Sequence, residues 1–149
     1  MFKFKHFPQY FLAFLLLVLL FLEGWTWYLG TPNVTFERLI GSEPYHEISD
    51  LSLRRYKKSA ISPHLFIIMT ENEDEVIQKF SKDCGMKKVD FDKVPALVHQ
   101  VDTEMVEVIK KSPYIYLTES YDLQNPKKGR MCLLFRDKSK LYLFVNGNV

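Results

Sequence analysis

The chain has 149 residues, a formal net charge of +2 and two cysteines. This near-neutral balance argues against a general nucleic-acid-binding protein, which would need a strong basic excess. The length allows one small domain beside a membrane segment, and the sequence contains no internal repeat and no long flexible linker.

The first thirty residues carry the clearest pattern. An unbroken apolar run extends from Phe11 to Leu22. As a helix this run reaches only about 18 Å, whereas the hydrocarbon core of a bilayer is about 30 Å thick. A helix over residues 7–29 reaches roughly 34 Å and places Trp25 and Trp27 in an interfacial aromatic belt. The sequence therefore predicts a membrane anchor that binds the lipid bilayer through residues 7–29. Its apolar run is bounded by Phe11 and Leu22, and Trp25 and Trp27 lie at one interface.

The alternative for this segment is a cleaved secretory signal, which also combines basic residues with an apolar stretch. Its cleavage site would need two small residues, and only Gly24 and Thr26 offer a tolerable pair. The lysines before the run place the N-terminus in the cytoplasm. We expect residues 1–30 to be an uncleaved signal anchor. Residues 34–149 would then form an extracytoplasmic domain, at a bacterial inner membrane facing the periplasm.

Both cysteines, Cys84 and Cys132, lie in the part predicted to be exported, where disulfides can form. A bridge between them would close a long loop and could stabilise the domain by roughly 4 kcal/mol. Two separate buried thiols are the alternative, because the sequence does not fix the distance between them.

Residues 34–62 predict a strand from Val34 to Ile40, followed by a helix that opens at Glu43-Pro44. A basic cluster comes next. It is typical of a solvated surface, with anionic lipid headgroups or an acidic partner as alternative ligands. Its members are Arg54, Arg55, Lys57 and Lys58.

A strand and a helix form the most regular part of the chain. The apolar run from His64 to Met69 predicts a buried strand. Acidic residues then suit the positive end of a helix dipole, and apolar residues recur on one helical face. The sequence therefore predicts a helix over 73–84, with Gly85 just beyond its end.

Apolar residues recur every three or four positions from Val94 to Val108, which predicts a second helix over about 95–111. In the alternative, residues 96–101 form a strand and Asp102 caps a shorter helix that begins at Thr103. Both interpretations predict a helix over 103–111.

The last third of the chain predicts a three-stranded antiparallel meander, with strands over 114–121, 130–136 and 140–145 and turns over 125–129 and 137–139. This sheet, packed by two or three helices, defines an α+β fold. Strand alternation assigns a wholly apolar set to the core face. That set is Ile115, Leu117, Met131, Leu133, Phe135, Leu141, Leu143 and Val145.

The opposite face of the meander mixes aromatic and polar residues, as the centres of protein interfaces do. The alternative is that residues 34–62 cover this face, because an exposed aromatic patch is uncommon on a monomer. The predicted partner-binding residues are Tyr114, Tyr116, Thr118, Tyr142 and Phe144, with basic residues Arg130, Arg136 and Lys140 at the edges.

The sequence contains no catalytic motif, and its histidine-acid groups at 46–50 and 99–104 do not match a zinc-binding spacing. We predict no cofactor, no metal and no nucleic acid. The predicted function is a membrane-tethered module that binds another protein, for example an immunity protein that neutralises an exported toxin or enzyme. The alternative is an accessory subunit of a secretion or division complex in the cell envelope, whose membrane helix contacts other membrane helices.

Overall fold

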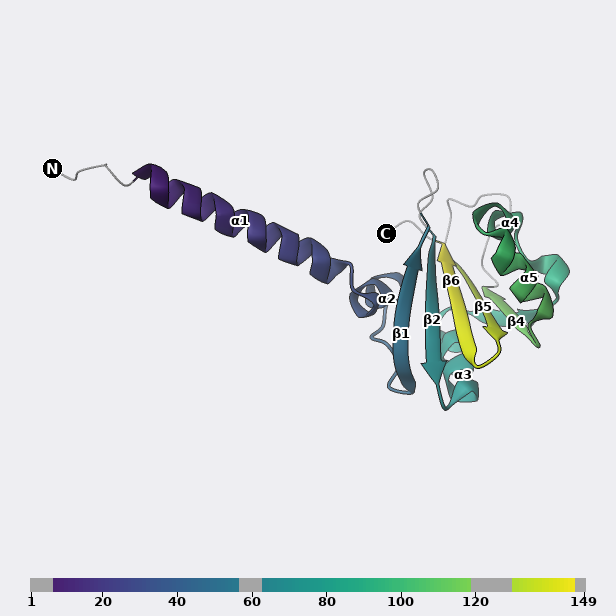
Figure 1. Cartoon of the computed structure of the whole chain (residues 1–149). Coiled ribbons are helices and arrows are strands. Elements are labelled where there is room, and N and C mark those ends of the chain that lie inside the picture. Colours follow the sequence, from purple (N-terminus) through teal and green to yellow (C-terminus); the bar gives the residue numbers. More distant parts are fainter. Residues whose placement is uncertain (1–6, 57–62, 119–129, 147–149) are drawn as a thin grey trace.

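The computed structural model describes residues 7–56, 63–118 and 130–146. Helix α1 spans Phe7–Leu29 and projects away from every other element (Figure 1). From Tyr10 to Leu29 it is long and apolar enough to cross a membrane, with a mean hydropathy of 1.9, and none of this span is buried. The predicted extent of this helix is confirmed. Length and composition alone fit both a membrane span and a signal sequence.

The described residues outside α1 form a six-stranded antiparallel sheet in the order β1-β2-β6-β5-β4-β3. The α+β class and the meander β4-β5-β6 are confirmed, whereas a sheet of only three strands is wrong. The strands are β1 (Ile48–Arg55), β2 (His64–Thr70), β3 (Met86–Val89), β4 (Ile115–Thr118), β5 (Met131–Asp137) and β6 (Lys140–Asn146). The predicted turn over 125–129 lies outside the described residues.

Helices cover both faces of this sheet. Those on one face are α2 (Pro32–Ile40) and α3 (Glu73–Asp83), and those on the other are α4 (Ala96–Val101) and α5 (Thr103–Lys111). A short 3-10 turn, η2 (Phe91–Lys93), precedes α4. Figure 1 shows α4 and α5 beside β4 and β5, at the end of the sheet away from β1.

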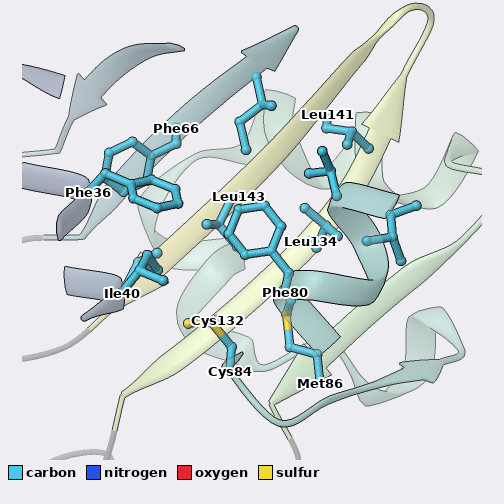
Figure 2. Packing of buried hydrophobic residues seen from close by; sticks show 14 of the residues in the cluster. Phe36, Ile40, Phe66, Phe80, Cys84, Met86, Cys132, Leu134, Leu141 and Leu143 are labelled. Atoms are coloured by element: carbon cyan, nitrogen blue, oxygen red, sulfur yellow. The ribbon is translucent and has the colours of Figure 1, made fainter. Parts of the chain in front are cut away.

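The α2/α3 face holds a cluster of aromatic rings. Phe36 of α2 lies with its ring centroid 5.4 Å from that of Phe66 and 5.8 Å from that of Phe80. All three side chains are fully buried. Figure 2 shows Phe80 of α3 packed over Leu134 and Leu143 of the sheet. This apolar contact, rather than local propensity, holds α2 and α3 in place.

Residues 32–40 form a helix, so the predicted strand from Val34 to Ile40 is wrong. Pro32 suits the first turn of a helix, and Gly41, with φ +87°, ends it in the left-handed region. Phe36 and Ile40 share one helical face at a spacing of four. The helix predicted from Glu43 is also wrong, because Ile48 opens β1.

The predicted helix over 73–84 is confirmed. Its first turn carries three acidic residues, and Gly85 follows Cys84 with φ +59°. The Asn72 side chain donates to Glu75 Oε2 at 3.1 Å rather than accepting a backbone N–H. The acidic residues complement the positive end of the macrodipole here, and the Thr70 hydroxyl accepts the Asn72 N–H at 3.0 Å.

The predicted second helix is divided in two at Asp102. Its Oδ1 accepts the backbone N–H groups of Glu104 at 3.0 Å and Met105 at 3.1 Å, which caps α5. The predicted cap is therefore confirmed, and the alternative strand over 96–101 is wrong, because these residues form α4.

The predicted division of the meander into two faces is wrong for β6. The turn between β5 and β6 is formed by Lys138 and Ser139, so Asp137 pairs with Lys140. Odd-numbered positions of β5 therefore lie beside even-numbered positions of β6. Leu141, Leu143 and Val145 accordingly face α2 and α3, together with Leu134, instead of joining Leu133 and Phe135.

Candidate functional site

Two of the predicted partner-binding residues belong to the core. Phe144 is fully buried among residues of α4 and α5, and Thr118 is 6% exposed. The Thr118 hydroxyl accepts the Cys132 N–H at 3.0 Å and donates to the Cys132 carbonyl at 3.2 Å. Neither side chain is available to a partner in this fold.

Tyr114 and Tyr116 lie on the α2/α3 face and are half-buried. The Tyr114 hydroxyl donates to the Glu73 carboxylate at the start of α3, and Arg136 Nη1 lies 3.2 Å from the same carboxylate. Burial, followed by this hydrogen bond, raises the pKa of Tyr114. These contacts attach α3 to the sheet.

Arg130 is half-buried and Lys140 is exposed at the start of β6.

Tyr142 lies on the other face of the sheet, in a row of cross-strand neighbours. Burial along this row shows how much of the face α4 and α5 cover. The row runs Ser52, Ile67, Tyr142, Phe135, Ile115. Phe135 and Ile115 are buried under the helices, Ile67 and Tyr142 are half-buried, and Ser52 is exposed. The β1–β2 half of this face is therefore open to solvent.

A pocket of about 170 Å³ lies at this boundary, between α5 and strands β1, β2 and β6. Its floor is apolar, with Leu65, Ile67, Phe135 and Tyr142. One wall is formed by Met105 and Val108 of α5, and the polar rim by Arg54, Tyr56, Asp102 and Glu104. We call these ten residues the α5 pocket.

The rim of the α5 pocket is held by a hydrogen bond between two elements. The Tyr56 hydroxyl donates to Asp102 Oδ2 at 2.9 Å, while Oδ1 of the same carboxylate caps α5. Burial and this bond raise the pKa of Tyr56, and the nearby Tyr56 hydroxyl raises the pKa of Arg54. The pocket thus presents a cation, a phenol and carboxylates around an apolar floor.

A second hollow, of about 520 Å³, lies between the start of α2 and β1. Its lining includes Pro32, Tyr45, His46, Ile48 and Asp50. It adjoins the end of α1, because Pro32 follows Leu29 within three positions.

Three potential metal ligands gather near β1, at His46, Glu47 and Glu75. The Glu47 carboxylate binds His46 Nε2 at 2.7 Å and the Lys79 ammonium, which also lies 3.3 Å from Glu75. Desolvation is the largest single effect on Glu47 and opposes its ionisation. The hydrogen bonds to Lys79, to the backbone and to Glu75, together with the charge of His46, outweigh it and lower the pKa to about 2. The Lys79 ammonium thus balances the negative charge of the Glu47 and Glu75 carboxylates.

The end of α1 is attached to the sheet by Arg55. Its Nη2 donates to the Gly30 carbonyl at 2.7 Å and to Thr35 Oγ1 at 3.3 Å. A cation at the C-terminal end of a helix also opposes the negative end of the macrodipole. Of the predicted basic cluster, Arg54 belongs to the pocket rim and Arg55 to this junction, while Lys57 and Lys58 lie outside the described residues.

The predicted disulfide candidates are brought together. Cys84 ends α3 and Cys132 lies in β5, and each of these free thiols shifts the pKa of the other. Both belong to the buried cluster beneath α2 and α3. The proximity is shown, and the oxidation of the pair stays a prediction.

Comparison of the chain with known protein families, with curated proteins and with solved structures finds no match in any of the three.

Proposed function

We propose that this chain is a membrane-anchored module that binds another protein outside the cytoplasm through the α5 pocket. The observation that carries the proposal is the size of the pocket, about 170 Å³. Pockets for small-molecule ligands usually enclose about 300–1,000 Å³, whereas a cavity of about 150 Å³ holds one benzene ring. A pocket of this size suits one aromatic or branched side chain from a partner protein.

The lining of the α5 pocket supports the same proposal. Protein interfaces concentrate their binding energy in a few buried anchors, with Tyr and Arg enriched and a polar rim around an apolar centre. Here Leu65 and Phe135 form a rigid, buried floor, and Tyr56 is fixed by Asp102. A partner side chain would enter a site that is already formed, so little ordering free energy would be needed.

The anchor gives the module its location. We propose that α1 crosses the bilayer with its N-terminus in the cytoplasm, as the lysines before the apolar run indicate. The hydrogen bonds from Arg55 to Gly30 and Thr35 would keep the domain close to the periplasmic surface of the membrane that α1 crosses. Anchoring raises the effective concentration of the pocket near that surface. An immunity protein against an exported toxin is one concrete form of such a module.

We expect Ile67→Arg to remove partner binding while the domain stays folded. Ile67 is a half-buried floor residue, so an arginine would fill the pocket and carry its charge to solvent. Loss of a buried anchor contact costs 2 kcal/mol or more, which is about thirty-fold in affinity. The measurement is the amount of partner that copurifies with the tagged full-length chain from host membranes in mild detergent.

Met69→Arg is the matched control. Met69 lies on the same strand and the same sheet face, is 40% exposed, and does not line the pocket. It should retain the partner at the level of the unmodified chain. Equal retention by both variants, or equal loss, would contradict the proposed role of the pocket.

A further inference from the structure

Two cysteines that lie 48 positions apart in the chain come together beneath α3. Cys84 is the residue that ends this helix, and Cys132 belongs to β5. Figure 2 shows both side chains at the same end of the apolar cluster, on the side of Met86. Both side chains belong to the same buried cluster, and both are free thiols. A disulfide needs two cysteine side chains that meet in this way.

The two thiols differ in reactivity and access. Hydrogen bonding to Cys132 and the charge of Arg130 lower the pKa of Cys84, whereas the same bond and burial raise the pKa of Cys132. Cys84 is 8% exposed and Cys132 only 1%. Since the thiolate is the nucleophile in disulfide exchange, Cys84 is the residue that an oxidant meets first.

We propose that Cys84 and Cys132 are a redox pair that closes into a disulfide between the end of α3 and strand β5. The oxidant is a disulfide, either of a protein oxidase or of a small thiol. The Cys84 thiolate attacks one of its sulfur atoms, forms a mixed disulfide and releases one thiolate. Cys132 then loses its proton and attacks Cys84 Sγ, which releases the second thiolate. Two electrons pass from the cysteines to the oxidant.

The bridge would join elements that are far apart in the sequence and close in space. Cross-linking over such a loop restricts the unfolded chain strongly. The neighbouring core, formed by Phe80, Met86 and Leu134, would then lose its freedom to open at the end of α3. We therefore expect the oxidised form to melt at least about 10 °C above the reduced form.

The test uses the purified full-length chain in detergent, incubated with oxidised glutathione, then denatured, alkylated and digested without reductant. We expect a peptide pair joined through Cys84 and Cys132. Cys132→Ser should retain glutathione on Cys84, whereas Cys84→Ser should carry little glutathione, because Cys132 is buried. Two alkylated thiols in the unmodified chain, or glutathione mainly on Cys132, would overturn the proposal.

Oxidation in the host rests on the proposed location of the domain, and a second arm separates the two claims. Thiols are blocked with an alkylating agent in intact cells before lysis, and the same peptides are analysed. A bridge found in cells supports both claims. Free thiols in cells, with a bridge formed by glutathione in the purified chain, support the redox pair and contradict an oxidising location.

Discussion

Phe144→Ala is expected to lower the free energy of unfolding by about 3–5 kcal/mol, the usual cost of removing a fully buried phenylalanine. Its side chain has no exposed surface and lies between Leu65 and Leu133 on neighbouring strands. The face is closed above it by α4 and α5. Truncation leaves a cavity that the close-packed sheet cannot fill. The measurement is urea denaturation of the full-length chain in detergent, followed by circular dichroism.

Tyr142→Ala is the matched comparison on the same strand. Tyr142 is half-buried at the pocket and stacks on Phe135 with a centroid distance of 5.4 Å. Its loss should cost about 1–2 kcal/mol, since a partly exposed ring loses less burial and leaves no enclosed cavity. A cost for Phe144→Ala equal to or below that for Tyr142→Ala would show that the β5–β6 register is wrong.

Val18→Arg is expected to lower the equilibrium constant for membrane insertion of α1 by about a hundred-fold. Val18 lies at the middle of α1, where an arginine costs roughly 2.5–3.5 kcal/mol on insertion scales, and each 1.4 kcal/mol is a factor of ten. Tyr10→Arg is the control, because Tyr10 lies near the N-terminal end of α1, where a cation would reach the membrane interface. The measurement is the fraction of chain that resists carbonate extraction from membranes.

The same membranes distinguish an anchor from a cleaved signal. Val18→Arg should fail to insert whether α1 is an anchor or a cleaved signal. The mass of the unmodified mature chain is therefore measured in the same experiment. We expect residues 1–30 to be present. Their loss from the exported chain would contradict the anchor and leave a free domain.

Local sequence patterns predicted the elements whose stability is largely local. The apolar length of α1, the acidic first turn of α3 and the Asp102 cap are all properties of a few neighbouring residues. The strand over 34–40 was predicted wrongly because periodicity does not separate a strand from a helix over a short apolar segment. Contacts of Phe36 with Phe66 and Phe80, which are distant in sequence, favour the helix.

The α5 pocket depends on long-range geometry, so the sequence predicted only part of its lining. Tyr142 was among the predicted surface residues and lines the pocket. The face on which each β6 residue lies depends on the length of one turn, and the two-residue turn at Lys138 and Ser139 places the β6 residues on the face opposite to the predicted one. The pocket exists because α5 stops short of β1 and β2. No periodicity within Thr103–Lys111 reports where that helix lies across the sheet. Asp102 alone gave a local signal, as a cap.

The most direct test of the proposed function is photo-crosslinking in the living host. Benzoylphenylalanine replaces Val108, which lines the α5 pocket, or Glu107, the exposed neighbour that lies about 100° away around α5. We expect one discrete protein adduct from position 108 that is absent from position 107, and mass spectrometry of this adduct would identify the partner. No adduct at position 108, or the same adducts at both positions, would contradict a protein-binding role for this pocket.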